Sequence, residues 1–313
     1  MGESVLAWFA RQKKTTGWLA VSVDANAMQF AHGRFQPGAK SLISNYGTQA
    51  LADGQGLEKL GQHMKLGRYE CATLLRPGEY QMLLVDAPSV PREELKSALR
   101  WKIKDMIDYH VDDATVDVLD IPPPEGMAGR NHMMFAVSAS NEVLHQKIRQ
   151  FEEARVPLSV IDIPETAQRN VAALYETGER ALGLVYFGED WGLLTINFRA
   201  ELYLARRLEV GVQQLTAEAA SRETALERLA VEVQRTLDHF DRQFRSVPVT
   251  RMLVAPSRAS GIADSLKARL GIEAQDIDLS DVLAFVGEQP DKETQRRLFH
   301  HFGATLRHEE KLL

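Results

Sequence analysis

The turn between two apolar runs at residues 183–196, GLVYFGEDWGLLTI, is where the sequence could carry phosphate chemistry. Tight turns between strands can hold a phosphate, because small residues let it approach the backbone N–H groups. Such a turn favours an aspartate with small neutral neighbours. Here Tyr186 precedes Gly188, and the acids Glu189 and Asp190 follow it. The residues leave open whether the segment is a nucleotide loop, a former one or only a hairpin.

Three polar clusters have side chains of the types that bind metals, at 108–113, 276–281 and 300–308. The first holds three acids and a histidine, but it falls between an expected helix and an expected strand, where polar turn residues are normal. The second resembles a calcium loop with Asp281 at the glycine position and Gly287 at the glutamate position, so the match fails. The third consists of histidines without a supporting carboxylate triad. We therefore predict no metal site.

Composition bounds the remaining classes of function. The chain has 313 residues, 44% hydrophobic and 26% charged, which is typical of a globular protein with one large or two medium domains. A net charge of −6 with scattered basic pairs argues against nucleic-acid binding. Cys71 is the single cysteine, which excludes an intrachain disulfide and fits a reducing compartment. Compact catalytic motifs such as GxxxxGK[ST] or GxSxG do not occur, so the residues indicate no enzyme.

The first residues, MGESVLAWFARQKK, form a short amphipathic segment over 1–16. Its basic residues follow the apolar ones, which is the wrong order for a signal peptide, and no apolar stretch of the chain approaches the roughly 20 residues that span a bilayer. Trp8, Phe9, Lys13 and Lys14 could hold this segment on a membrane surface. The alternative is a terminal helix that packs its aromatic residues on its own domain.

The elements that would position these side chains mix helices and strands, which indicates an α/β or α+β class. In the first part we expect a hairpin at 17–35, a helix at 55–67, and a compact β-α-β-β-α unit from about 71 to 154. In the second part we expect a helix from Pro164, the opening hairpin continued through 201–208, a long helix at 221–244, a strand at 251–255, a helix at 259–270 and a helical end at 291–310. Similar glycine-containing hairpins in both parts suggest a duplicated architecture.

The stretch ALRWKIKDMIDYHVDDATVDVLDI at 98–121 resembles the signature of the PilM family of type IV pilus assembly proteins, approximately A-hydrophobic-RWE-x-x-x-x-IPFP-x-E-E. The matching residues are Ala98, Arg100, Trp101, Ile107 and Tyr109, and the departures are Lys102, Asp108 and His110. LAWFARQKKTTGWLAV near the start, VEVQRTLDHF at 231–240 and FGATLRHEEKLL at the end resemble other family segments in the same order. The cytoplasmic domain of the secretion protein GspL is a more distant relative of this family.

This resemblance implies an α/β, actin-like ATPase (ribonuclease H-like) fold in two halves, with a small insert in the first half. The boundaries are then 17–181 for the first half with its insert at about 71–154, 182–290 for the second half, and 291–313 for a closing helix that returns to the first half. The resemblance also implies a cytoplasmic protein at the inner-membrane assembly platform, which grips the tail of a bitopic PilN-like protein. The partner-binding positions carried over are Arg100, Trp101, Ile107 and Tyr109.

The phosphate hairpins depart from the family pattern. In ATP-binding members the first hairpin resembles GIDIGSSS, and here Ser22 stands for the metal-associated aspartate and Asp24 for the second glycine. An acid at that point would repel a phosphate. In the second hairpin Tyr186 stands for the aspartate and Gly188 is retained.

The adenosine region departs as well. Pro256 removes an N–H group and Arg258 would fill the base pocket, while Gly211 and Gly261 remain of the family's glycines. We therefore expect a scaffold that binds no nucleotide. The alternative is an ATPase that still binds ATP and Mg²⁺, with Asp24 or Asp190 in the metal role.

Overall fold

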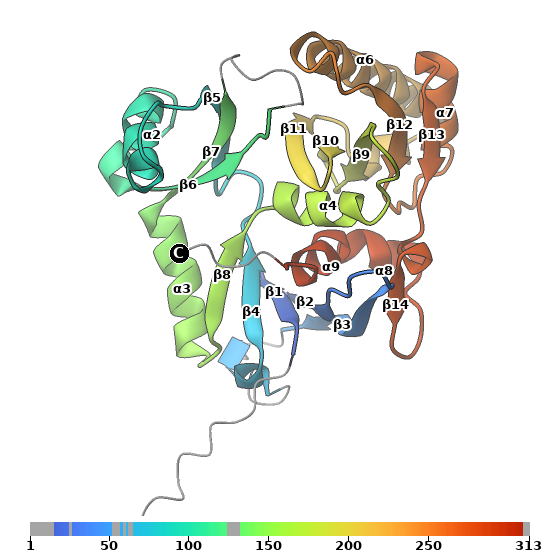
Figure 1. The fold of residues 1–313 in the computed structure, drawn as a ribbon. Coiled ribbons are helices and arrows are strands. Elements are labelled where there is room, and N and C mark those ends of the chain that lie inside the picture. Colours follow the sequence, from blue (N-terminus) through green and yellow to red (C-terminus); the bar gives the residue numbers. More distant parts are fainter. Residues whose placement is uncertain are drawn as a thin grey trace, which may run out of the picture.

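The computed structural model describes residues 16–24, 27–51, 57–58, 61, 65–123 and 132–308. Two large sheets lie one above the other with helices between them, and a third, small sheet stands beside them (Figure 1). The predicted amphipathic segment, with Trp8, Phe9, Lys13 and Lys14, lies outside the described residues, as does most of the helix expected at 55–67. Within the described ranges, no helix combines the length and apolar character needed to span a membrane.

The first large sheet has six strands in the order β14-β3-β2-β1-β4-β8. The expected hairpin forms its centre, with Trp18 of the first strand opposite Gly33 of the second. Its apolar residues alternate, so that Leu19 and Val21 are buried against the residues that cover one face of the sheet. The strands are β1 (Trp18–Val23), β2 (Ala27–Arg34), β3 (Ser41–Ala50), β4 (Glu70–Leu74), β8 (Leu158–Asp162) and β14 (Leu283–Phe285).

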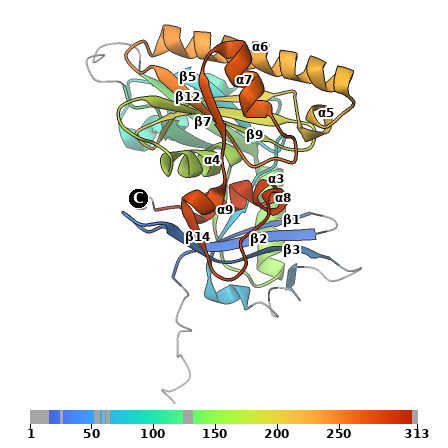
Figure 2. The ribbon, with the colours of Figure 1, turned by 90° about the vertical axis from the view of Figure 1, so that its right-hand side faces the viewer.

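The second large sheet has five strands in the order β11-β10-β9-β12-β13. These are β9 (Ala181–Phe187), β10 (Gly192–Phe198), β11 (Glu201–Leu208), β12 (Val249–Val254) and β13 (Glu273–Asp276). Helices α6 (Ala219–Gln243) and α7 (Ile262–Leu270) cover its outer face, and α5 (Val212–Leu215) precedes them (Figure 2). The stripe of α6 that the sequence marks as apolar is buried, including Leu226, Leu229, Val233 and Phe240.

Two helices fill the space between the large sheets, α4 (Pro164–Ala173) below the second sheet and α9 (Phe299–Thr305) above the first (Figure 2). They cross so closely that a Cβ on Gly303 would lie 2.1 Å from the carbonyl oxygen of Ala167. A residue with a side chain at position 303 would therefore push the two helices apart. Helix α8 (Lys292–Arg297) leads into α9.

The insert is a small three-stranded sheet, β5-β7-β6, covered by one helix. Its elements are β5 (Gln81–Asp86), η2 (Arg92–Glu94), α2 (Leu95–Ile103), η3 (Val111–Asp113), β6 (Ala114–Asp120) and β7 (Met133–Ser140). Leu99 and Ile103 of α2 are fully buried against the sheet residues Val116 and Ala136.

The structure differs from the expected boundaries at three points. Residues 71–74 belong to β4 in the first large sheet, so they are not part of the insert. Helix α3 (Asn141–Glu153) packs Phe151 into the core of that same sheet, beside Leu19 and Cys71. Strand β14 pairs in parallel with β3, although the sequence places it in the second half. In each case strand pairing or side-chain packing between distant segments decides the assignment.

Candidate functional site

The turn between β9 and β10 is held by backbone contacts that require its glycines. Gly188 N donates to Trp191 O at 2.8 Å, and a Cβ on Gly188 would lie 2.6 Å from Trp191 Nε1. A Cβ on Gly211, at the start of α5, would lie 2.5 Å from Glu189 O. Val212 N then donates to Gly188 O at 2.8 Å. Gly211 is thus needed for the close approach between the turn and α5, and Gly188 is needed for the close approach of the Trp191 indole within the turn.

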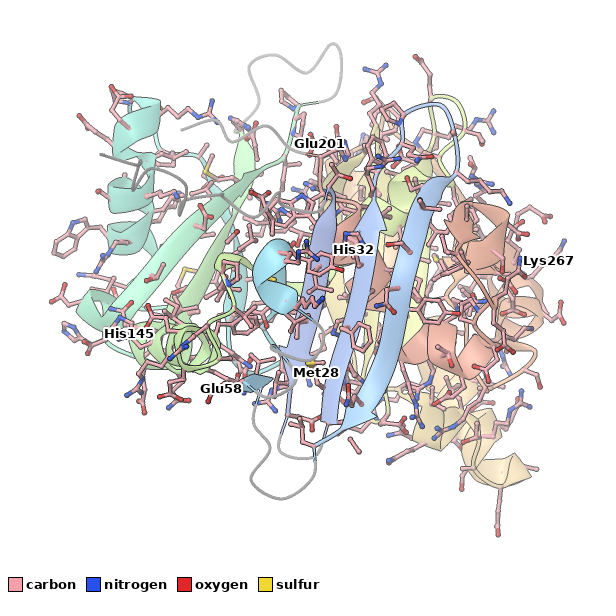
Figure 3. All side chains as sticks on the ribbon, turned by 90° about the horizontal axis from the view of Figure 1, so that it is seen from below. Met28, His32, Glu58, His145, Glu201 and Lys267 are labelled. Carbon is pink, nitrogen blue, oxygen red and sulfur yellow. The ribbon has the colours of Figure 1, made fainter. Side chains whose placement is uncertain are left out.

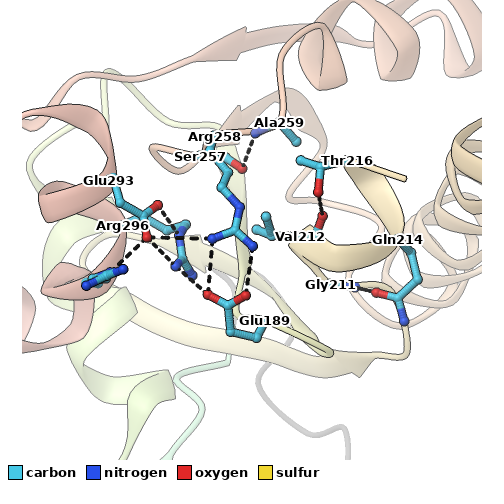
Figure 4. Close-up of polar contacts among 11 residues, drawn as sticks. Glu189, Gly211, Val212, Gln214, Thr216, Ser257, Arg258, Ala259, Glu293 and Arg296 are labelled. Carbon is cyan, nitrogen blue, oxygen red and sulfur yellow. Dashed lines mark hydrogen bonds and ion pairs between the residues drawn. The ribbon is translucent and has the colours of Figure 1, made fainter. Parts of the chain in front are cut away.

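Glu189 of this turn lies at the centre of a cluster of charged side chains (Figure 4). Its Oε2 accepts from Arg258 Nη2 at 2.9 Å, and its Oε1 accepts from Arg296 Nη2 at 2.6 Å. Arg296 also donates to Glu293 at 2.7 Å. We call these four residues the Glu189 cluster. It joins the turn, the loop after β12 and α8, which are far apart in the sequence.

Charge pairing dominates the electrostatics of the Glu189 cluster. The Arg296 side chain is 4% exposed, so its charge requires partners inside the protein. Hydrogen bonds from Arg296 lower the pKa of Glu293 to about 2, and the bond to Glu293 in turn raises the pKa of Arg296. The negative charge that the sequence places at the turn is thus matched by two guanidinium groups.

Tyr186 is part of the packing between β9 and α9. Its ring lies 5.4 Å from that of Phe299 and 4.3 Å from that of His300, and it also contacts the indole of Trp191. Burial raises the pKa of Tyr186 to about 12 and lowers the pKa of His300 to about 3. Tyr186 is therefore a neutral core side chain.

The other predicted nucleotide positions are distributed around these elements. Asp24 is exposed at the end of β1, where its Oδ1 accepts from Ala27 N at 2.8 Å and so stabilises its own turn. Ser22 is half-buried in β1 opposite Gln29. Pro256 is buried after β12, and Gly261 begins α7 with a left-handed φ of 72°. The structure thus gathers Tyr186, Gly188, Gly211 and Arg258 around one turn, and places Ser22 and Asp24 on the hairpin of the other sheet.

The four predicted partner-binding residues have different surroundings. Arg100 Nη2 donates to Val111 O at 2.6 Å and holds η3, and Ile107 packs against the core of the insert. Trp101 projects from α2 and is 69% exposed. Tyr109 donates to Ser138 Oγ at 3.0 Å and lines a groove.

This groove has a volume of about 800 Å³ and separates the insert from α3. On one side lie Tyr109 and Asp113, and on the other Ile148 and Arg149 of α3. His145, on the same helix, also lines it (Figure 3). We call it the α3 groove. It combines apolar side chains with charges of both signs, which suits a short peptide.

The acidic clusters considered as metal sites act as turn and cap residues. Asp108 forms two hydrogen bonds with the side-chain amide of Gln81, as its backbone N–H donates to Gln81 Oε1 and its Oδ2 accepts from Gln81 Nε2. Asp278 Oδ1 accepts from Ser280 N at 2.9 Å and caps η4 (Leu279–Asp281). Among the residues that the structure describes, no three His, Cys, Asp or Glu side chains gather in a way that could hold a metal.

Sequence reasoning missed Glu293 and Arg296 as parts of the site. A local signal was present, because an acid with arginines three and four residues later is a stabilising helical arrangement. Nothing in that spacing shows that Arg296 also reaches Glu189 across 107 positions of sequence.

No family model matches the chain, and no curated protein matches it significantly. Solved structures that resemble it include the PilM–PilN type IV pilus biogenesis complex, with a TM-score of 0.66 and 18% identity over 93% of this chain and 96% of that one. Another is the cytoplasmic domain of EpsL, an inner-membrane component of the type II secretion system of Vibrio cholerae, with a TM-score of 0.48, 11% identity and coverage of 91% and 95%. A Bacteroides thetaiotaomicron protein with an actin-like ATPase fold and unknown function has a TM-score of 0.47 and 10% identity, over 88% of this chain and 95% of that one. The predicted actin-like α/β fold is therefore confirmed, in a PilM-like form.

Proposed function

We propose that this protein is a non-catalytic scaffold of a type IV pilus assembly platform, of the MSHA type and equivalent to MshI. In this role it lies in the cytoplasm at the inner membrane and holds the cytoplasmic tail of a bitopic PilN-like protein. A PilO-like protein and the pilus assembly ATPase are further partners. The observation that carries the proposal is the likeness to the PilM–PilN complex over 93% of the chain.

The Glu189 cluster supports the non-catalytic part of the proposal. A phosphate near the second hairpin would compete with Glu189 for Arg258 and Arg296, which already donate to that carboxylate at 2.9 Å and 2.6 Å. Tyr186, at the position of the family's metal-associated aspartate, is buried and neutral. Binding a nucleotide here would require breaking paired charges in a partly buried site, which is costly.

The α3 groove is the surface that we assign to the tail. It contains Tyr109, one of the positions carried over from the family signature, and its opposite wall carries Ile148, which is 37% exposed. Exposed apolar side chains are common anchors for a partner when charged groups surround them. Arg149 and Asp113 supply such charges at the rim. A short tail with an apolar residue between charged residues fits this lining.

The proposal is tested with a fluorescent synthetic peptide that has the sequence of the cytoplasmic tail of the PilN-like protein encoded beside this gene. Anisotropy titration of the full chain should show saturable binding, and Ile148→Asp should weaken it by about tenfold or more. The matched control is Val231→Asp on α6, which changes an exposed apolar residue to the same acid far from the groove in sequence. Absence of binding, or equal weakening by both variants, would contradict the proposal.

The alternative function is an actin-like ATPase that binds ATP and Mg²⁺ in an unusual way. The observation in its favour is that Asp24 and Asp190, at the tips of the two hairpins, are both exposed and could approach a metal. Loss of nucleotide binding in Asp24→Ala would identify this case.

A membrane-surface role for residues 1–14 is compatible with either function. Liposome flotation with and without these residues tests it, and equal flotation would remove Trp8, Phe9, Lys13 and Lys14 from consideration.

A further inference from the structure

Strand β11 forms one end of the second large sheet and borders a cavity. The strand order begins with β11, which pairs with β10 and, within the described part of the chain, with no other strand. The cavity has a volume of about 390 Å³ and lies between β11 and the insert, which face each other in Figure 1. It is separate from the α3 groove, because the two share no lining residue among those described.

The backbone of β11 faces this cavity. Five consecutive residues, 203–207, line it. Side chains of a strand alternate between the two faces of the sheet, so a run of consecutive lining residues shows that the edge of the strand borders the space. An unpaired strand edge presents a row of N–H and C=O groups that can pair with another extended chain.

The opposite wall of the cavity is apolar. It consists of one face of the small sheet, where Met82 and Leu84 of β5 and Phe135 of β7 point in the same direction. Leu84 is 37% exposed, so part of this apolar wall is accessible from outside. This wall would receive alternate side chains of a segment that pairs with β11.

The exposed rim is basic. Arg206 and Arg207 are exposed on β11, and His239 is exposed on α6. Arg206 Nη1 donates to Thr236 Oγ1 at 3.3 Å, and the Arg207 guanidinium lies over the Trp191 ring at 5.7 Å. Within the described residues, neither arginine forms an ion pair with a carboxylate.

The acid that lines the cavity, Glu165, lies near enough to Arg207 for their charges to interact, but the described residues show no ion pair between Glu165 and either arginine. Glu165 is 9% exposed and accepts from Tyr80 at 2.6 Å. Among the described residues, the cavity thus combines a strand edge that has no partner strand, an apolar wall and two arginines without an ion pair at its mouth. An extended chain with apolar and acidic side chains could contact all three of these features.

We propose that β11 is a docking edge for an extended acidic segment of a partner protein, which adds to the sheet as a further strand. Main-chain hydrogen bonds to β11 supply the pairing, the face with Met82 and Leu84 receives apolar side chains, and Arg206 and Arg207 select acidic ones. This site is distinct from the surface assigned to the membrane-protein tail, so the two proposals succeed or fail separately.

The test uses three fluorescein-labelled peptides of about ten residues, the usual upper length of a strand. The first alternates glutamate and valine, the second alternates lysine and valine, and the third is the first with alternate backbone N–H groups methylated. The full chain should bind the first at least about tenfold more tightly than either of the others. Hydrogen exchange should show new protection of those amides of residues 203–207 that do not already donate to β10.

Two double variants complete the test. Arg206→Glu with Arg207→Glu should weaken binding of the acidic peptide by about tenfold or more. Arg235→Glu with Arg242→Glu makes the same charge change at exposed positions of α6 and should leave binding within about twofold. The proposal is overturned if the acidic peptide does not bind, if the methylated peptide binds equally well, or if both double variants behave alike. Ile148→Asp should leave this binding unchanged, which separates it from tail binding.

Discussion

Glu189 and Arg296 are joined by a 2.6 Å hydrogen bond between Oε1 and Nη2, although 107 positions separate them in the sequence. The bond connects the β9–β10 turn to α8, and Arg258 adds a third segment through its bond to the same carboxylate. Because the Arg296 side chain is 4% exposed, removing a carboxylate from it leaves a poorly solvated charge. The β9–β10 turn is thus fixed to α8 and to the loop after β12 by ion pairs within the protein.

The first prediction concerns the stability of the Glu189 cluster. Glu189→Gln should lower the free energy of unfolding by about 1–2 kcal/mol, since Glu189 is half-exposed and Glu293 remains as a partner of Arg296. Urea denaturation measures the change. Glu273→Gln breaks the exposed pair with Lys267 and should cost less than about 0.5 kcal/mol. Equal effects of the two variants would show that the Glu189 cluster adds no stability.

The second prediction concerns the close approach at Gly211. Gly211→Ala places a Cβ 2.5 Å from Glu189 O, a backbone atom that cannot rotate away. The turn and α5 must then separate, and unfolding should become easier by about 1–3 kcal/mol. Thermal denaturation checks this, with Gly67→Ala as the control because the contact nearest to its Cβ is at 3.8 Å. If Gly211→Ala melts at the temperature of the control, the backbone contact is not a constraint.

The third prediction follows from two buried histidines. Burial lowers the pKa of His300 to about 3 and that of His301 to about 4, from an ordinary value of 6.5. The unfolded chain therefore binds more protons than the folded chain below pH 6.5. Stability should be complete above that pH and should fall by about 1.4 kcal/mol per pH unit for each histidine as the pH drops toward 4. Urea titrations between pH 7 and 5 measure the slope, and a flat profile would contradict it.

The fourth prediction distinguishes these two histidines. In the described structure both ring nitrogens of His301 are buried without a hydrogen-bond partner, whereas His300 Nε2 bonds to Gln168 Oε1 at 3.3 Å. His301→Leu should therefore raise the free energy of unfolding by about 1 kcal/mol and reduce the acid slope. His300→Leu leaves Gln168 Oε1 without this partner, so it should give no such gain. Calorimetry of both variants at pH 7 measures these changes in stability. A loss of stability in His301→Leu would count against this explanation.

Local patterns predicted the hairpins and α6 because their buried residues recur with the period of the element, as Leu19 and Val21 do in β1. Strand β3 was missed because its second half is mostly polar and has no alternating apolar pattern. Its extended conformation there is stabilised by pairing with β2. Strand β14 has three residues and pairs with β3 across 242 positions of sequence, as Leu283 does with Ser41. No sequence periodicity carries such long-range information.

In the candidate site, too, local features could be predicted from the sequence and long-range contacts could not. Gly188 could be identified from the sequence because its neighbours form a recognisable turn. The partners of Glu189 could not, since Arg258 and Arg296 reach it only after the second sheet and α8 are in place. The resemblance to a family identified Tyr109 but gave no indication that Ile148 lies across the same groove.

Titration of the full chain with a fluorescent ATP analogue in the presence of Mg²⁺ tests the central claim, that this actin-like fold works without nucleotide. We expect no saturable binding at micromolar concentrations, because the carboxylate of Glu189 already pairs with Arg258 and Arg296. The family resemblance, which aligns the buried Tyr186 with a metal-associated aspartate, leads to the same expectation. Saturable micromolar binding that is lost in Asp24→Ala would contradict the scaffold proposal and establish the ATPase alternative.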